Sequence, residues 1–452
     1  MIARWIACAL LAVLLGACAR REASQEDPWA SDLTHFPRPK PYLGMPERVT
    51  GKLPQQLSQT GAFQNVATLS VAPGLIPYDL IVPFWSDGAV KTRWVSIPSE
   101  GVRFSSTGEW HFPKGTVFVK NFDLPLDAAD PTRRRRLETR LLVLDADGGA
   151  YGVLYKWRAD GTDADLLPGS LTEQIGTRTS DGSTNVQTWY YPSRKDCLTC
   201  HTQNAGRVLG VKTRQLNRDF RYPSGFTENE LSAWSRLKLF RNSSADLNPA
   251  KLPKLAATDD TSRSLEARAR SYLDANCAHC HRPGGTVAYF DARYDTPAAD
   301  QKIVGGAVLL DEGVDHPRVV APNDIWRSIA YIRINTIGDL RMPPLARETI
   351  DHNGVALVRS WIKSLSAPPV LAPPDFLPRS GTVPRETLLR LVARQVDAEI
   401  HFTTDGSEPG LDDPKYVGPI RLRETTIVRA RAYKEGYTHS ITAQEVFVVA
   451  HR

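Results

Sequence analysis

Cysteine and methionine are scarce in this sequence, and beyond the N-terminus no apolar run reaches about 18 residues. The missing runs exclude a bundle of membrane-spanning helices. The 452 residues include six cysteines and three methionines, with 41% hydrophobic and 23% charged residues. This composition is ordinary for globular proteins and excludes wholesale disorder. The formal net charge of +6 is too small to indicate nucleic-acid binding by itself.

The N-terminus has the pattern of an export signal. Arg4 supplies positive charge, and the apolar run over residues 5–15 is too short to span a membrane. Residues 15–18 read LGAC, which resembles a bacterial lipobox and implies acylation of Cys18. The alternative is an ordinary signal peptide with an incidental cysteine. We expect a lipoprotein signal peptide over residues 1–17 and a lipid-anchored protein on the periplasmic side of the envelope. Because no aspartate follows Cys18, the outer membrane is favoured over the inner.

The four cysteines beyond the signal lie in two motifs of one kind, CLTCH at residues 197–201 and CAHCH at residues 277–281. This pattern is typical of covalent c-type haem attachment, in which two sulfurs hold the porphyrin and the histidine binds iron. A zinc ribbon would place its cysteine pairs about 15–20 residues apart, whereas 76 residues separate Cys200 from Cys277. Two redox dithiols or two structural disulfides would leave the histidine after each pair unexplained.

We therefore predict two covalently bound haem c groups as cofactors. The predicted attachment residues are Cys197, Cys200, Cys277 and Cys280, and the predicted iron ligands are His201 and His281. Residues 263–366 resemble a class I c-type cytochrome: a helix, the second motif, a loop region, a methionine and a final helix. That resemblance implies Met342 as the distal iron ligand of the second haem.

The first motif has no such partner nearby, because residues 202–276 contain neither histidine nor methionine. Candidate sixth ligands elsewhere are Met45, His35, His111, His316 and His352. A lysine or asparagine ligand would also complete the first haem, and an open iron would need no further ligand. The sequence leaves this choice open.

Residues 380–452 alternate like strands and carry TTDGSEP at 403–409, Tyr416, GPI at 418–420 and VRA at 428–430. These features resemble the small β-sandwich at the C-terminus of chitobiase and hexosaminidase relatives, over about 70 residues. Such a module is usually accessory. The resemblance implies either a structural spacer or contact with cell-wall polysaccharide.

These features together predict a multidomain α+β fold. It comprises an N-terminal β-rich sandwich or barrel, an α-helical class I cytochrome c-type haem region and a small C-terminal β-sandwich. The expected divisions are a tether (18–50), a β-rich domain (51–192), a first haem module (193–262), a cytochrome-like domain (263–366), a proline-rich linker (367–379) and the C-terminal module (380–452).

The arrangement as a whole resembles exported bacterial dihaem proteins, and similar haem-bearing segments occur on quinoprotein dehydrogenases. It implies a lipid-anchored periplasmic dihaem cytochrome c that transfers electrons from a dehydrogenase to a downstream acceptor. The alternative is a dihaem peroxidase or oxygenase with an open first haem, and a third hypothesis is a binding protein. An electron-transfer protein is favoured over an enzyme, and no catalytic residue is identified. The expected partner is a redox protein, with no nucleic acid and with membrane contact only through the lipid.

Overall fold

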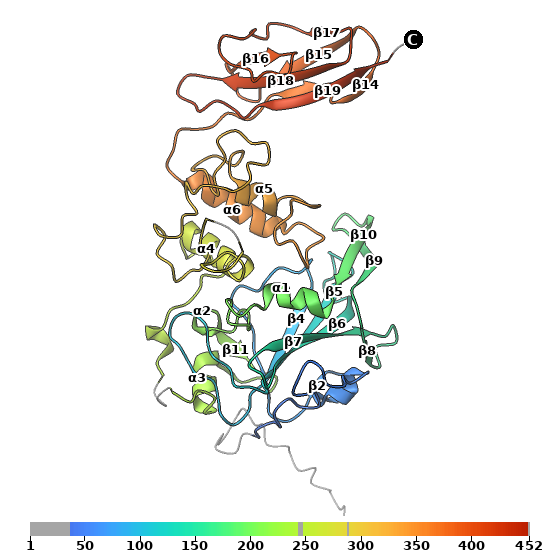
Figure 1. The fold of residues 1–452 in the computed structure, drawn as a ribbon, viewed down its shortest axis with the longest axis vertical. Coiled ribbons are helices and arrows are strands. Elements are labelled where there is room, and N and C mark those ends of the chain that lie inside the picture. Colours follow the sequence, from blue (N-terminus) through green and yellow to red (C-terminus); the bar gives the residue numbers. More distant parts are fainter. Residues whose placement is uncertain (1–36, 243–246, 287–288, 451–452) are drawn as a thin grey trace, which may run out of the picture.

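The computed structural model describes residues 37–242, 247–286 and 289–450. The expected signal peptide, Cys18 and His35 lie outside these residues. A β-rich N-terminal part, a middle part with three helices and a small C-terminal sandwich follow one another along the long axis (Figure 1). Within the described chain, no helix is both long enough and apolar enough to cross a membrane.

The N-terminal part is built on one six-stranded antiparallel sheet whose strands follow sequence order. Its strands are β3 (Leu75–Pro77), β4 (Val90–Ser96), β5 (Val117–Pro125), β6 (Arg134–Leu144), β7 (Ala150–Trp157) and β8 (Ala164–Leu166). Some neighbouring strands are joined by short turns, such as the DADGG turn of residues 145–149 between β6 and β7.

The two faces of this sheet are covered differently because side chains alternate along each strand. One face, with Trp94, Leu141 and Val153, forms a core with the segment around residues 42–75. That segment holds the short elements η2 (Leu57–Thr60), β1 (Phe63–Asn65) and β2 (Ser70–Val71). The opposite face, with Phe118 and Leu142, packs against a second core that includes residues 208–240. The first motif and the chain after it are therefore built onto this second face.

Several short elements follow the sheet before the middle part. They are β9 (Leu171–Arg178), β10 (Thr184–Tyr191), α1 (Arg194–Cys200), α2 (Thr213–Leu216), β11 (Asp219–Arg221), β12 (Thr227–Asn229), α3 (Glu230–Arg236) and η3 (Pro249–Lys251). Helix α1 begins at Ser193, whose hydroxyl accepts a hydrogen bond from the Asp196 amide, in a capping box. The helix lies on β7, so closely that a Cβ at Gly152 would come within 2.6 Å of the Cys197 Sγ.

The middle part contradicts the expected α-helical haem region. Its helices are α4 (Leu265–Asn276), α5 (Ile329–Ile334) and α6 (His352–Ser364), of 12, 6 and 13 residues, and the described chain between them consists mainly of turns, bends and isolated bridges. The helical pattern of apolar residues extends over these short segments and not over the chain between them, because helix-breaking residues interrupt that chain. These are Pro283, Gly284, Gly285, Pro297, Gly305, Gly306, Gly313, Pro317 and Pro322. The chain as described is mostly β-sheet.

The C-terminal part is a small β-sandwich, as its alternation predicted. One sheet has the order β13-β15-β17 and the other β14-β19-β18-β16. The bounds are β13 (Asp375–Leu377), β14 (Gly381–Val383), β15 (Thr387–Val392), β16 (Glu399–Thr403), β17 (Ile420–Leu422), β18 (Thr426–Tyr433) and β19 (Ala443–Val449). Inward-facing residues such as Leu389, Val428 and Phe447 form the core between the sheets.

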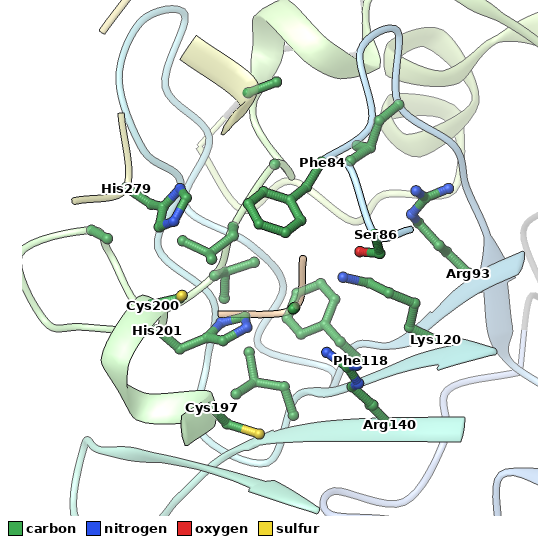
Figure 2. A pocket seen from close by; sticks show the side chains of 18 of the residues that line it. Phe84, Ser86, Arg93, Phe118, Lys120, Arg140, Cys197, Cys200, His201 and His279 are labelled. Atoms are coloured by element: carbon green, nitrogen blue, oxygen red, sulfur yellow. The ribbon is translucent and has the colours of Figure 1, made fainter. Parts of the chain in front are cut away.

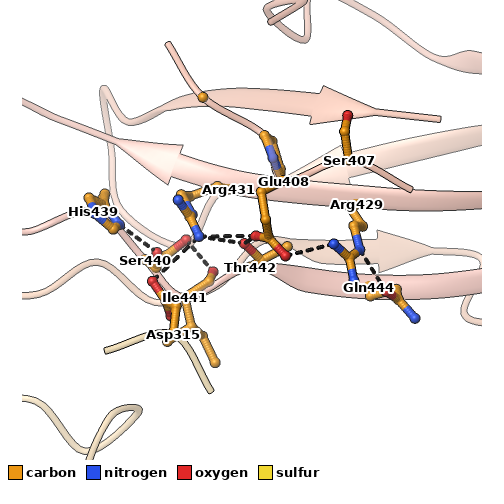
Figure 3. Close-up of polar contacts among 12 residues, drawn as sticks. Asp315, Ser407, Glu408, Arg429, Arg431, His439, Ser440, Ile441, Thr442 and Gln444 are labelled. Atoms are coloured by element: carbon orange, nitrogen blue, oxygen red, sulfur yellow. Dashed lines mark hydrogen bonds and ion pairs between the residues drawn. The ribbon is translucent and has the colours of Figure 1, made fainter. Parts of the chain in front are cut away.

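A polar network fastens this sandwich to the middle part (Figure 3). Asp315 accepts hydrogen bonds from Arg431 at 3.4 Å and from Arg327 at 2.8 Å. Arg327 is 5% exposed, and it also donates to the carbonyl oxygens of His439 and Ser440, each at 3.2 Å. One arginine thus joins both sides of the contact.

Candidate functional site

The fold brings the two Cys-x-x-Cys-His motifs together. Just after the first motif, the Asn204 side-chain amide donates to the Pro283 carbonyl at 2.9 Å. Just after the second, Arg282 donates to the Asn204 carbonyl at 3.1 Å and to the Glu109 carboxylate at 2.8 Å. A buried ion pair of 2.9 Å between Lys212 and Asp274 joins the same two chain segments again.

One cysteine from each motif meets at this junction. The thiols of Cys200 and Cys280 lie close enough to shift each other's ionisation: the interaction lowers the pKa of Cys280 and raises that of Cys200. The thiolate of the pair is therefore favoured at Cys280. Interaction with His279 lowers the pKa of Cys280 further. Both residues are partly exposed and neither is in a disulfide.

The other two cysteines have different surroundings. Cys197 packs against Gly152 on β7, and burial raises the pKa of its thiol. Cys277 ends α4 and lies beside the core of the middle part, where burial raises its pKa to about 12. Both are therefore thiols at neutral pH. The four motif cysteines are not equivalent.

The motif histidines are held neutral. The Nδ1 atom of His201 is 2.6 Å from the Arg207 carbonyl, and burial lowers the pKa of this imidazole to about 3. His281 stacks on Phe290 with ring centroids 4.4 Å apart, and burial lowers its pKa to about 4. His279 meets Phe84 edge to face at 5.5 Å.

A cavity of about 160 Å³ lies between the second face of the sheet and the first motif (Figure 2). Cys197, Cys200, His201 and His279 line one side of it. Side chains of β4, β5 and β6 line the other, including Lys120 and Arg140, which point toward the motif residues in the close-up.

The predicted pair of covalent haem c groups is contradicted by this arrangement. The part of the chain that the structure describes contains no group of three or more His, Cys, Asp or Glu residues that could hold a metal ion. The cavity is also smaller than the roughly 300–1,000 Å³ of typical cofactor and ligand pockets. Finally, the contact between Cys200 and Cys280 joins sulfurs that the prediction assigned to two different porphyrins. The residues present do not fit the two groups.

The predicted methionine and histidine ligands are dispersed. Met45 is 5% exposed in the core on the opposite face of the sheet. Met342 follows α5, and its backbone amide donates to the Arg333 carbonyl at 3.0 Å. His352 begins α6, and His111 pairs with Arg103 in an isolated bridge. Among the described residues, the cavity lining includes none of these four, nor His316.

Sequence reasoning missed the positively charged side of the cavity. Lys91, Arg93, Lys120 and Arg140 are separated in sequence, but β4, β5 and β6 place them on one face. The available signal was basic residues at alternate positions of otherwise apolar strands, such as Lys91 and Arg93 in β4.

Comparison with known proteins identifies one segment. Residues 378–444 match the model of the chitobiase/beta-hexosaminidase C-terminal domain. These residues form most of the C-terminal sandwich, so this part of the expected resemblance is confirmed. No curated protein and no solved structure matches the chain.

Proposed function

We propose that this chain is a lipid-anchored periplasmic redox protein that transfers electrons by thiol–disulfide exchange through Cys200 and Cys280. The observation that carries the proposal is the meeting of the two motifs, which brings these two thiols close enough to shift each other's pKa. Location in an oxidising compartment, where dithiols and disulfides interconvert, is supported by the LGAC export pattern.

The roles of the two cysteines follow from which one holds the proton. The Cys280 thiolate attacks a disulfide of a partner protein, forms a mixed disulfide and releases one partner thiolate. The Cys200 thiol gives its proton to that thiolate, and its sulfur attacks Cys280. The Cys200–Cys280 disulfide closes and the second partner thiolate leaves. Two electrons have passed to the partner, and the reverse sequence accepts two electrons from a dithiol.

The partner expected for this chemistry is another redox protein of the envelope. Both cysteines are partly exposed residues, as attack on the disulfide of such a partner requires. Cys197 and Cys277 take no part, because burial keeps both as protonated thiols.

The reduction potential tests this function. Equilibration of the full chain with glutathione buffers should give one two-electron transition between about −270 and −120 mV, the range of redox-active dithiols. Cys200→Ser and Cys280→Ser should each abolish the transition, whereas the matched variants Cys197→Ser and Cys277→Ser should retain it. A transition below about −300 mV would indicate a structural disulfide and would count against the proposal. A visible porphyrin spectrum in the purified chain would overturn it.

A second function is favoured for the C-terminal sandwich by its family match. We propose that it contacts polysaccharide of the cell wall. Val417 is 91% exposed and Leu411 is 64% exposed, so the sandwich offers apolar side chains to such a partner. Cosedimentation of the full chain with insoluble peptidoglycan or chitin should be saturable and reduced by Val417→Asp. If the wild type and Val417→Asp sediment equally and without saturation, the sandwich acts as a spacer and does not bind polysaccharide.

A further inference from the structure

The sheet register places three cations in one row across the cavity. Arg93 on β4 lies opposite Lys120 on β5, and Lys120 lies opposite Arg140 on β6. Like charges directly opposite each other destabilise a sheet. The row therefore needs negative charge nearby, and the number of neighbouring carboxylates decides whether the protein itself supplies enough.

The two arginines of the row are neutralised by the protein. Arg140 forms an ion pair of 2.5 Å with Glu138, and Arg93 forms one with Asp79. The other cations of the cavity wall are also paired, Lys212 with Asp274 and Arg282 with Glu109.

Two lysines of the cavity wall form no ion pair within the described chain. Lys91 donates to the Phe84 backbone carbonyl, and Asp87 and Glu138 act on Lys91 and Lys120 only through longer-range attraction. Their Nζ atoms lie 5.8 and 6.0 Å from the centroid of the same Phe122 ring, and repulsion from Lys120 lowers the pKa of Lys91, so the two side chains are neighbours. Burial lowers the pKa of both, that of Lys120 to about 7. Burial disfavours the charge of these part-buried amines, and a bound anion would supply the counter-charge that restores it, so the two lysines together form a site for an anion.

Part of the remaining lining of this small cavity is apolar. Phe84, Phe118, Leu80 and Val82 line it beside the two lysines, whereas polar side chains, among them the paired Glu109 and Asp274, line other parts. A cavity of about 150 Å³ with apolar walls can hold one benzene molecule, and this one has about 160 Å³. The site thus has two lysines beside an apolar patch, in a cavity with room for a single ring.

We propose that this cavity binds a small carboxylate with a compact apolar or aromatic body, of the size of benzoate. The carboxylate lies between Lys91 and Lys120, and the body packs against Phe84 and Phe118. Figure 2 shows Phe84, Phe118 and Lys120 in the cavity wall. The inference rests on the cavity and its lysines. Cys200 lines the same cavity, but the proposal uses none of its redox chemistry.

Isothermal titration of the full chain with benzoate tests the proposal, with benzamide as the uncharged analogue. Benzoate should bind saturably at one site, and benzamide should bind at least about tenfold more weakly because it lacks the charge. This comparison needs no variant. Absence of saturable benzoate binding, or equal affinity for the two compounds, would overturn the proposal.

Variants locate the site. Lys120→Met should weaken benzoate binding at least about tenfold. The control variant is Lys114→Met. The Lys114 ammonium donates to the Ala146 carbonyl at an exposed site, so this variant should bind benzoate as the wild type does. Unchanged binding in a folded Lys120→Met protein, judged by circular dichroism, would overturn the placement. Benzoate binding is measured without a redox partner, so its failure would not count against the thiol–disulfide proposal. Likewise, failure of the glutathione titration would not count against benzoate binding.

Discussion

At the residue scale, the second face of the sheet contains ionisable groups in surroundings that oppose their charge. Glu230, at the start of α3, is fully buried, and one of its carboxylate oxygens accepts a hydrogen bond from the Asp79 amide at 2.8 Å. Its other oxygen, Oε2, is buried and has no hydrogen-bond partner among the described residues. Burial raises the pKa of this carboxyl well above 4.5, so ionisation opposes folding.

Replacing this carboxyl by an amide should make the protein more stable in alkaline solution. A raised folded-state pKa means that the native protein binds more protons than the unfolded chain, so stability is lost as pH rises above about 4.5. Glu230→Gln keeps the acceptor for the Asp79 amide and removes the charge. Urea unfolding at about pH 8 should show a gain of about 1–3 kcal/mol, which disappears below about pH 4.5.

The matched control for this prediction is Glu435→Gln, at an exposed position of the C-terminal sandwich. It should leave the stability profile unchanged. If Glu230→Gln were less stable than the wild type at every pH, Glu230 would be a stabilising anion and the account of its burial would be wrong.

At the scale of the elements, α4 is tied to the chain before α2 by one buried ion pair. The Asp274 side chain is 1% exposed and that of Lys212 is 9% exposed, and Asp274 also accepts from the Tyr294 amide at 2.9 Å. Breaking a buried pair leaves one charge without compensation, which costs far more than losing an exposed pair. This contact holds the second motif, three residues beyond Asp274, against the first.

Asp274→Asn should therefore lower the free energy of unfolding by about 3–5 kcal/mol. Chemical denaturation followed by tryptophan fluorescence measures this loss. The control is Asp165→Asn, which breaks an exposed pair of 2.5 Å with Arg158 and should change the stability little. Equal effects of the two substitutions would mean that the Lys212–Asp274 pair does not fasten the motifs.

At the scale of the whole molecule, Arg327 connects the middle part to the sandwich through Asp315, Asp324 and two backbone carbonyls. Arg327→Ala should leave Asp315 and Asp324 without this partner and loosen the contact. Trypsin should then cleave after Arg379, whose side chain is 77% exposed, at least several-fold faster. The control Arg423→Ala lies at an exposed ion pair and should not change the rate. Equal cleavage rates would refute this role of Arg327.

How much of this molecule the sequence predicts depends on the range of the interactions involved. Alternation along residues 426–433 places every second residue inside, and it predicted the sandwich correctly. The helices at 265–276 and 352–364 were also visible in the pattern, with a loop region between them, but the length of the irregular chain in that region was not. A helical domain was therefore expected where the chain is mainly irregular.

The site was predictable only in its parts. Each motif identifies its own cysteines, but Cys200 and Cys280 are 80 positions apart, and only the folded chain brings them together. In the same way, Arg93, Lys120 and Arg140 become neighbours through strand register, which single-strand patterns do not specify. The haem prediction was made from local spacing alone, and the three-dimensional arrangement contradicts it.

The proposed function depends on Cys200 and Cys280 forming the redox-active pair. Peptide mass spectrometry of the mildly oxidised full chain, with free thiols blocked before digestion, tests it directly. A disulfide-linked peptide joining Cys200 to Cys280 should be found, with Cys197 and Cys277 recovered as blocked thiols. Disulfides within each motif, or motif peptides carrying a thioether-linked porphyrin, would contradict it.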